Sequence, residues 1–426
     1  MKSYGMRGIG VWIIFFLGIA CGQVPSQDAH KYGAEILLEQ KLGWIKGKRL
    51  AIVTNLTSRV YDQVHLVDTL HKVGQDIKFI YAPEHGFRGE AEAGAHIAGG
   101  IDSATGIPIR SLYGEKKKPS LAELQAVDVV LFDIQDVGVR FYTYLSTLVY
   151  VMEACAEANK PLIVLDRPNP NGWYIHGPVL SSGLESFVGL HPVPVVYGMT
   201  LGEYAKMVNG ERWLKGKKTC RLEVLLAQGY RHDMHWSDWN RNWVPPSPNL
   251  PTVVSAEWYP VLGWYEGTPV SVGRGTPEPF TRIGAPWHQT WYRNWRTDSA
   301  TSPSIYTVGG MKFRADRFIP SSIPGKSLHP PYEGQTCFGV KCISSPASGD
   351  TLWSTGLQLL LSFYQEYSER GDPKFPFFNS FFSRLSGDPL LKEDIMLGKT
   401  PNQIIDRWKP SIGEFRRIRS KYLLYP

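Results

Sequence analysis

The 426-residue chain has only five cysteines, too few for a fold that depends on disulfide bonds. None of them forms a C-x-x-C pair, and no histidine joins them at zinc-finger spacing, so a structural zinc site is not expected. Cys155 lies in an apolar helical pattern and is expected to be a small buried side chain. A disulfide between Cys337 and Cys342 is left open, because an oxidising compartment would permit it.

The chain also lacks the glycine-rich loops that bind nucleotide phosphates. No G-x-G-x-x-G or G-x-x-x-x-G-K-[ST] segment follows a predicted strand, so we expect no dinucleotide or nucleoside triphosphate cofactor. The absence of a G-x-S-x-G elbow disfavours an α/β-hydrolase serine triad, and the histidines form no H-E-x-x-H pair. We expect no cofactor and no metal. A metal site formed by Glu84, His85 and Asp133 is kept as an alternative.

Charge of one sign does not dominate, since 46 Lys and Arg residues are mixed with 39 Asp and Glu residues. The compact basic runs, Lys116–Lys118 and the segment from Arg416 to Lys421, lack the density and interleaved aromatics of a nucleic-acid tract. We therefore expect solvated surfaces there and no nucleic-acid partner. The net charge of +7 would suit an anionic small substrate.

No apolar run reaches the roughly 20 residues that a membrane span needs. The run from Gly8 to Gly22 follows a basic start and ends in small residues, which is typical of a secretory signal peptide. We predict that residues 1–21 are a signal peptide and that the protein is exported. Residues 17–21, LGIAC, resemble an imperfect lipoprotein cleavage site. Whether Cys21 carries a lipid is left open, and such an anchor would be the one membrane attachment.

The first half of the chain alternates between strand-like and helix-like segments. Short apolar runs lie at 49–55, 77–84, 108–114, 127–136 and 161–166, and helical periodicity lies at 34–44, 64–73, 120–126 and 144–158. Ser120 and Glu123 have the spacing of a capping box. This alternation predicts an α/β domain with a doubly wound parallel sheet.

The composition and periodicity of the sequence change near residue 216. A stretch rich in Trp, Asn and Pro follows, and then come expected strands at 304–313 and 335–343 and helices at 351–369 and 402–421. We predict a first domain over 22–215 and a smaller α+β domain over 216–426.

Polar residues follow four of the predicted strands. They are Asn55 after the first, Glu84 and His85 after the second, the segment 133–140 after the fourth, and the segment 166–169 after the fifth. In open α/β sheets the ligand crevice lies at the carboxyl ends of the strands. These turns are therefore expected to converge on one crevice.

The turn at 83–89, PEHGFRG, concentrates three ionisable side chains. Glu84 and His85 could supply acid–base catalysis, and Arg88 could bind an anion. The alternative is a structural ion pair between Glu84 and Arg88. Glu90 and Glu92, just downstream, are expected to be exposed.

The segment 132–144, FDIQDVGVRFYTY, places two acids at the end of an apolar strand, where a charge is costly unless it is paired. Arg140 could form an ion pair with Asp133 or Asp136 and so stabilise this loop. Alternatively, one of the acids orients a catalytic group while Tyr142 or Tyr144 contacts a sugar.

Other polar turns offer ligands for a sugar. Asn169 lies in a proline-stiffened turn after Arg167 and can bond hydroxyl or acetamido groups. Asn249 lies in a similar turn. Glu266 follows two aromatic residues, which could raise its pKa, and Arg274 stands between two glycines where it could bind a carboxylate bidentately. Each of these residues is as well explained by ordinary loop structure.

Together these segments resemble the exo-β-N-acetylmuramidase family, glycoside hydrolase family 171. The matching motifs are VTNLTS, PEHGFRGEAEAG, SLYGEKKKPS, FDIQDVGVRFYTYLST, VLDRPNPNGW, GPVL, VGLHPVPVVYGMT, PSPNLP, EGTPVSVGRGTPEPF and YLLY. The resemblance implies a Rossmann-like first domain, a smaller second domain and an active site in the cleft between them. It also implies hydrolysis of terminal N-acetylmuramic acid from the non-reducing ends of peptidoglycan fragments, in cell-wall turnover or recycling in the periplasm.

The resemblance further implies that Glu84 is the catalytic glutamate, with Glu92 as a weaker candidate. His85, Asp133 and Tyr142 are expected to assist Glu84. The expected substrate-binding residues are Asn55, Arg88, Asp136, Arg140, Tyr144, Arg167, Asn169, Asn249, Glu266 and Arg274. Tyr197 stands where relatives carry a His, and it is assigned no role. A non-catalytic muropeptide-binding protein and a metal-dependent hydrolase are the rival functions, and the second catalytic group is left open.

Overall fold

The computed structural model describes residues 30–89, 99–295, 305–346, 348–370 and 376–426. The predicted signal peptide, Cys21, Glu90 and Glu92 lie outside the described residues. None of the described helices combines the length and the apolar character that a membrane span needs.

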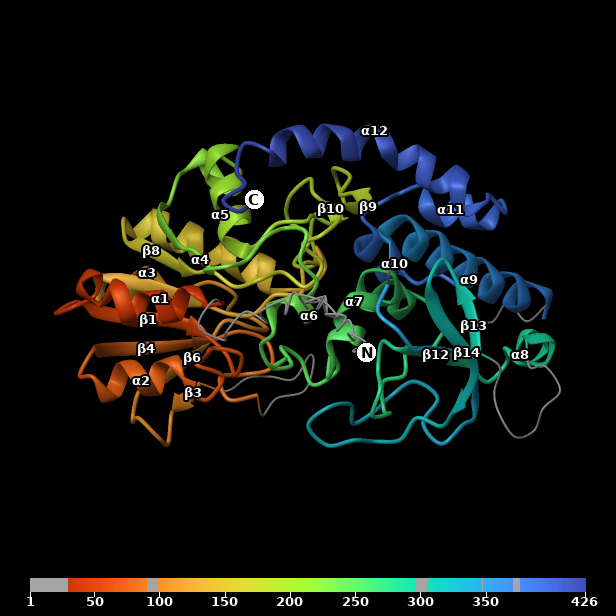
Figure 1. Ribbon diagram of the computed structural model, residues 1–426, viewed down its shortest axis with the longest axis horizontal. Helices are drawn as coiled ribbons and strands as arrows, with labels where there is room; N and C mark the ends of the chain where they lie inside the picture. The colour runs from red at the N-terminus through yellow and green to blue at the C-terminus, as the bar shows by residue number, and fades with distance from the viewer. Residues whose placement is uncertain (1–29, 90–98, 296–304, 347, 371–375) are drawn as a thin grey trace, which may run out of the picture.

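A seven-stranded sheet forms the centre of the first half of the molecule (Figure 1). Its strands, from one edge to the other, are β11 (Arg221–Leu225), β8 (Pro161–Leu165), β7 (Val129–Asp133), β1 (Arg49–Thr54), β4 (Asp76–Ala82), β6 (Pro108–Ser111) and β5 (Gly100–Ile101). All neighbours are parallel except β5 and β6. The boundary drawn near residue 216 stays a prediction; β11, just beyond it, pairs with β8.

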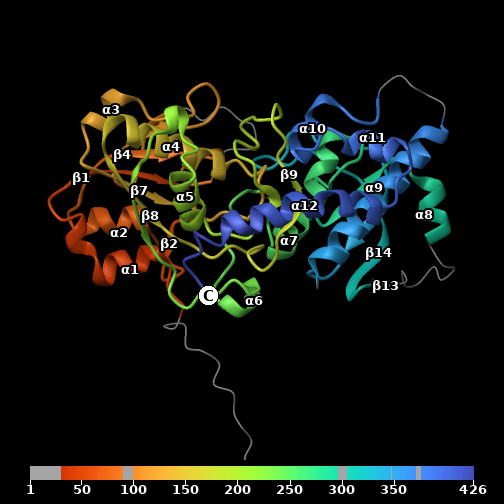
Figure 2. The same ribbon diagram turned by 90° about the horizontal axis from the view of Figure 1, so that it is seen from above.

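Helices cover both faces of this sheet, which confirms the doubly wound arrangement. Helices α1 (Gly33–Gln40) and α2 (Leu66–Lys72) lie on one face, and α3 (Leu121–Gln125), α4 (Tyr144–Ala158) and α5 (Leu201–Gly210) lie on the other (Figures 1 and 2). Residues 50–53 of β1 alternate between the two apolar cores, so all four are apolar. Ser120 and Glu123 form the predicted capping box at the start of α3.

The second half contains a four-stranded antiparallel sheet in the order β12 (Arg282–Ala285), β15 (Cys337–Cys342), β14 (Met311–Phe318) and β13 (Ile305–Val308). The single strand expected at 304–313 is a hairpin instead, because Gly309 and Gly310 both adopt positive φ and turn the chain. The helices here are α6 (Trp236–Trp239), α7 (Val253–Leu262), α8 (Gln289–Trp295), α9 (Gly349–Glu369), α10 (Ser380–Ser386), α11 (Leu391–Met396) and α12 (Pro401–Arg419). Two small hairpins, β2 (Arg59–Val60) with β3 (Val64–His65) and β9 (His176–Val179) with β10 (Pro194–Val196), complete the strands.

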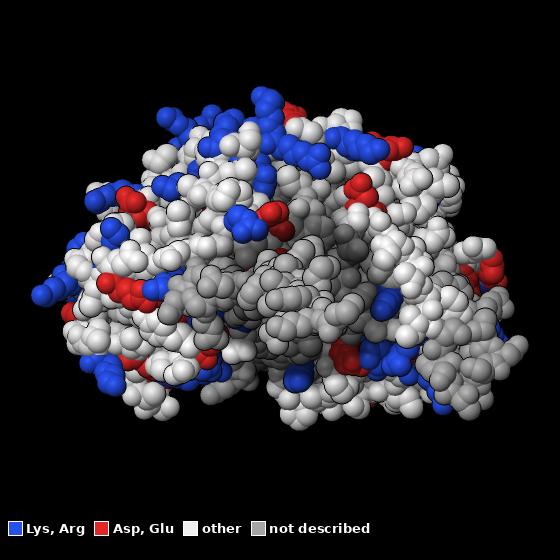
Figure 3. Space-filling view, in the orientation of Figure 1, with Lys and Arg blue, Asp and Glu red and all other residues white. Residues whose placement is uncertain are grey.

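The last helix, α12, runs across the top of the molecule and returns the chain to the first sheet (Figure 1). There the Tyr425 hydroxyl donates to Asp166 at 2.7 Å, and the Leu424 amide donates to Glu203 at 2.8 Å. Basic side chains gather along the edge formed by α12 (Figure 3). Of the basic run from Arg416 to Lys421, Lys421 is exposed and pairs with Glu211, as predicted for a solvated face. Arg419 is half-buried and donates to the carbonyl of Gly198 at 2.8 Å.

The cysteines of the described residues are all free and buried. Cys337 and Cys342 lie at opposite ends of β15, which separates them by roughly 16 Å at the usual rise per residue. A disulfide needs its two Cα atoms within about 7 Å, so the pairing left open above does not form. Cys155 is completely buried, as expected.

Arg140 joins the two halves of the molecule. Its guanidinium donates to the carbonyl oxygens of Pro178 at 2.7 Å, Val193 at 2.9 Å, Leu385 at 3.1 Å and Ser386 at 2.6 Å. The pairing expected with Asp133 or Asp136 is therefore wrong. Complete burial lowers the pKa of Arg140 to about 9, and within the described part of the chain it forms no ion pair.

We predict that Arg140→Met lowers the free energy of unfolding by about 3–5 kcal/mol, because four buried carbonyl groups lose their donor. Urea denaturation measures this change. The matched control is Arg231→Met, whose side chain is 55% exposed, and it should change stability by less than about 0.5 kcal/mol. Equal effects of the two substitutions would contradict the role given to Arg140.

Candidate active site

The carboxyl ends of β1, β4, β7 and β8 meet at one edge of the sheet, and the predicted polar turns converge there. The Asn55 amide donates to the Tyr144 hydroxyl at 2.8 Å, and the Gln135 amide side chain donates to the carbonyl of Pro168 at 2.7 Å. Gly138 allows the turn after β7 to approach this point, since a side chain there would collide with Asn169. The convergence predicted from the sequence is confirmed.

Glu84 is half-buried at the end of β4. Its carboxylate accepts a hydrogen bond from the Thr143 hydroxyl at 2.8 Å. The hydroxyl of Tyr113 faces the same carboxylate, and burial together with that charge raises the pKa of Tyr113. The following residue, His85, is buried and adopts φ of 72°, an unusual conformation for a residue other than glycine. This tight turn fixes the place at which Glu84 leaves the strand.

Three tyrosines form an aromatic wall near Glu84. The Tyr142 ring packs edge-on against Tyr144 at 4.8 Å and against Tyr259 at 5.8 Å between centroids. Burial raises the pKa of all three, and the Glu84 charge adds to that effect, so their hydroxyls stay neutral. The Tyr142 hydroxyl is buried and has no hydrogen-bond partner among the described residues.

Glu266 and Arg274 form an ion pair, with 2.7 Å between Oε1 and Nε. Their side chains are 23% and 21% exposed. Burial lowers the pKa of Arg274, but Glu266 and, to a smaller extent, Glu84 raise it above the usual value. The two glutamates thus act on the same guanidinium, which places Glu84, Glu266 and Arg274 in one region.

Arg274 has no acidic residue within three positions in the sequence, but the fold supplies Glu266 as its partner. The guanidinium also lies over the Phe280 ring, 5.2 Å from its centroid. Within the described part of the chain, Arg274 donates a hydrogen bond through Nε only.

Several other predicted site residues serve the scaffold. Arg88 pairs with Asp68 and Asp102, so the pairing expected with Glu84 is wrong. Asp133 is fully buried and binds Arg167, with 2.6 Å between Oδ1 and Nε. These ion pairs tie neighbouring turns together.

The predicted amide ligands also bond the protein's own backbone. Asn169 donates to the carbonyl of Met199 at 2.8 Å, and Asn249 donates to that of Lys326 at 2.9 Å. Direct contact of these residues with a substrate stays a prediction.

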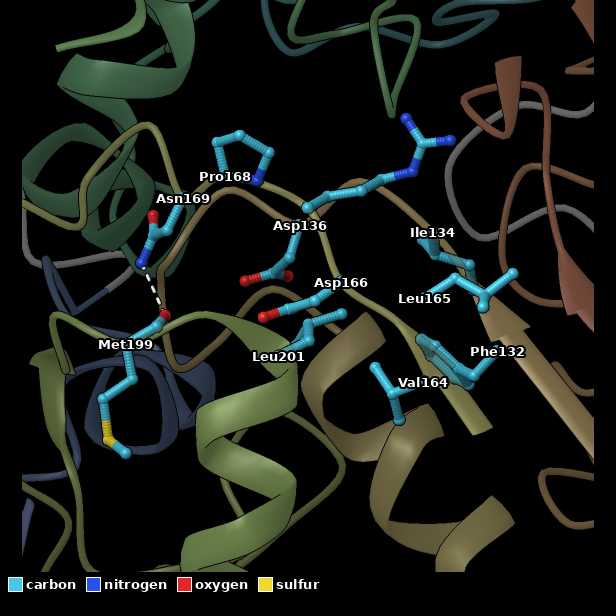
Figure 4. A pocket seen from close by; sticks show the side chains of 11 residues that line it. Phe132, Ile134, Asp136, Val164, Leu165, Asp166, Pro168, Asn169, Met199 and Leu201 are labelled. Atoms are coloured by element: carbon cyan, nitrogen blue, oxygen red, sulfur yellow. Dashed lines mark hydrogen bonds between the residues drawn. The ribbon is translucent and has the colours of Figure 1, made fainter. Parts of the chain in front are cut away.

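Asp136 and Asp166 line a narrow cavity of about 10 Å³, room for one water molecule (Figure 4). Asp136 accepts from the Tyr197 hydroxyl at 2.6 Å and from the Gly138 amide at 2.8 Å, both on Oδ2. Asp166 accepts from Thr200, Gly202 and Tyr425. Burial raises the pKa of each carboxyl group to about 6.

Sequence reasoning missed Tyr113, Thr143 and Tyr259. The first two lie inside the recognised segments SLYG and FYTY, but nothing in those segments marks them as partners of Glu84. Tyr259 lies on α7, far from any of the polar turns in the sequence. In the described ranges, no three His, Cys, Asp or Glu side chains gather into a potential metal site.

The chain matches known proteins along nearly its whole length. Residues 50–254 match the family model described as exo-β-N-acetylmuramidase NamZ, N-terminal, and residues 257–425 match its C-terminal counterpart. The peptidoglycan β-N-acetylmuramidase NamZ of Bacillus subtilis (strain 168) is 37% identical over 407 residues, which cover 95% of this chain and 93% of the relative.

Two crystal structures of DUF1343 family proteins from Bacteroides fragilis NCTC 9343 share the fold. One is 39% identical, with a TM-score of 0.75, and the match covers 93% of this chain and 99% of the other. The second is 31% identical, with a TM-score of 0.78 and coverage of 94% and 100%.

We predict that Asp136→Asn stabilises the protein above pH 6. The folded state binds the Asp136 proton more tightly than the unfolded chain, so wild-type stability falls as the pH rises from about 4 to 6. Asparagine can keep both hydrogen bonds to its oxygen and does not ionise. The gain should reach about 1–3 kcal/mol above pH 6 and vanish below about pH 4.

Urea denaturation across this pH range measures the difference. Asp233→Asn, at a carboxyl group that is 74% exposed, controls for the loss of one negative charge. A constant difference between Asp136→Asn and wild type at every pH would contradict the burial of an ionisable Asp136.

Proposed function

The chain belongs to the exo-β-N-acetylmuramidase NamZ family, and we propose that it hydrolyses terminal N-acetylmuramic acid from the non-reducing ends of peptidoglycan fragments. The observation that carries this proposal is the position of Glu84. It is a half-buried carboxylate at the carboxyl end of a parallel strand, held by Thr143 and facing neutral tyrosines. This setting suits a group that transfers a proton to or from a glycosidic oxygen.

Glu84 acts as the general acid–base residue in this proposal. A glycosidase needs a second carboxyl group, or a substrate acetamido group that acts as the internal nucleophile. Asp136 acts on the same tyrosines as Glu84, but it is buried. Glu266 is the other carboxylate in the region, and Arg274 already holds it. The bound Glu266 serves best to fix Arg274, and the acetamido group of N-acetylmuramic acid is then the nucleophile.

Arg274 supports selection of the muramyl sugar. N-acetylmuramic acid differs from N-acetylglucosamine by a lactyl ether whose carboxylate is ionised at neutral pH. Glu266 and the Phe280 ring fix the orientation of the guanidinium. Its two terminal amino groups could then donate parallel hydrogen bonds to the lactyl carboxylate.

The cellular setting is part of the same proposal. The signal-peptide pattern of residues 1–21 supports export. A peptidoglycan substrate then places the enzyme in the periplasm, free or anchored through a lipid on Cys21, with a role in cell-wall turnover.

Glu84→Gln should lower kcat on an aryl glycoside of N-acetylmuramic acid by roughly 10²–10⁴-fold, because the amide cannot transfer the proton. The control is Glu115→Gln, an exposed position at which activity should not change. A thermal melt checks that both variants fold. Near-wild-type kcat in Glu84→Gln would overturn the assignment. Binding without turnover by the wild type would favour a muropeptide-binding protein.

Arg274→Ala should lower kcat/KM for the muramyl glycoside by about 10–150-fold, the value of a charged hydrogen bond. A matched glucosaminide, which lacks the lactyl carboxylate, should lose little. The ratio of the two kcat/KM values is the measurement. Equal losses on both glycosides would mean that Arg274 only supports Glu266.

A further inference from the structure

The three consecutive lysines at 116–118 differ in their partners. Lys116 pairs with Glu123 at 2.7 Å, and Lys118 pairs with Glu157 at 2.8 Å. Lys117 lies over the Phe187 ring instead, with its ammonium nitrogen 4.9 Å from the ring centroid. Across the described ranges, Lys117 is the member of this run that forms no ion pair. It is half-buried.

Lys117 is held in place by a row of aromatic rings from separate segments. Phe187, in the loop between β9 and β10, stacks on Tyr150 of α4 with 5.9 Å between centroids and 10° between planes. The Tyr113 ring also contacts Phe187, with 6.4 Å between the ring centroids. Because the Tyr113 hydroxyl faces Glu84, the row leads from the proposed catalytic carboxylate to the Lys117 ammonium.

This row is more exposed than the aromatic wall formed by Tyr142, Tyr144 and Tyr259. Tyr113, Phe187 and Lys117 are all half-buried, whereas Tyr142 and Tyr259 are only 7% and 8% exposed. An enzyme that removes a terminal sugar holds that sugar in the enclosed part of its site. The rest of the glycan must leave through the open part, where Lys117 stands.

We propose that Lys117 binds the lactyl carboxylate of the next N-acetylmuramic acid residue, two sugars beyond the bond that is cleaved. This inference rests on the proposed function. In a glycan of alternating sugars, every second residue carries such a carboxylate. A glycan whose first carboxylate binds Arg274 therefore carries its next carboxylate two sugars further along. An ammonium fixed on an aromatic ring is preorganised to meet it. Lys117 is thus a specificity residue for longer fragments.

The test compares two peptide-free substrates, the disaccharide MurNAc–GlcNAc and the tetrasaccharide MurNAc–GlcNAc–MurNAc–GlcNAc. Wild-type kcat/KM should be higher for the tetrasaccharide, and added salt should reduce this preference. Lys117→Met should lower kcat/KM for the tetrasaccharide by about three- to tenfold and leave the disaccharide unchanged. The matched control, Lys116→Met, should change neither.

Equal losses on both substrates, no loss on either, or the same loss in Lys116→Met would overturn the proposal. A loss seen only with a disaccharide that carries a stem peptide would assign Lys117 to a peptide carboxylate and would also overturn it. If the wild type released no sugar from either substrate, that result would contradict the proposed hydrolysis but would leave the binding role of Lys117 to be tested. Tetrasaccharide affinity, measured by calorimetry in Glu84→Gln with and without Lys117→Met, then decides the role of Lys117.

Discussion

The arrangement of the site depends on one buried guanidinium, that of Arg140. It comes from the loop after β7 and binds carbonyl groups of the β9–β10 region and of the end of α10. The same loop carries Asp136, Tyr142 and Thr143, so the contact that joins the two halves of the molecule also sets the positions of the aromatic wall and of the donor to Glu84. A buried cation that bonds only carbonyls is costly to desolvate, and satisfying several of its donors at once offsets that cost.

Charged groups around the sheet edge divide into two kinds. Arg88 and Arg167 are held by aspartates from neighbouring turns, and these pairs stabilise the scaffold. Glu84, the Glu266–Arg274 pair and Lys117 are only partly buried. Partial exposure lets these groups exchange water for a substrate, which is what a site for a charged sugar requires.

Much of the fold could be predicted from the sequence because the signals are local. Continuous apolar strands such as β7 require cover on both faces, and the Ser120–Glu123 spacing marks the start of α3. The convergence of the polar turns follows from parallel strands, and it brought Glu84 and Asn55 to one edge correctly. The hairpin at Gly309 and Gly310 was missed because an apolar run resembles a single strand until its turn is recognised.

Partners that meet only through the tertiary fold could not be predicted. Arg274 finds Glu266 across a loop, Arg140 finds carbonyls of the second half, and Tyr113 reaches Glu84 from a different strand end. Tyr197 was assigned no role from the sequence, yet it donates to Asp136. No periodicity or spacing in the sequence identifies such side chains as partners. Their contacts are set by tertiary packing and not by their positions along the chain.

The most direct test of the account is a time course of the products from a defined peptide-free glycan with N-acetylmuramic acid at its non-reducing end. Mass spectrometry should show free N-acetylmuramic acid as the first product and a glycan that shortens from that end. A glycan of the same length that begins with N-acetylglucosamine should stay intact. Internal cleavage, or release of sugar from the second glycan at the same rate, would contradict an exo-acting muramidase.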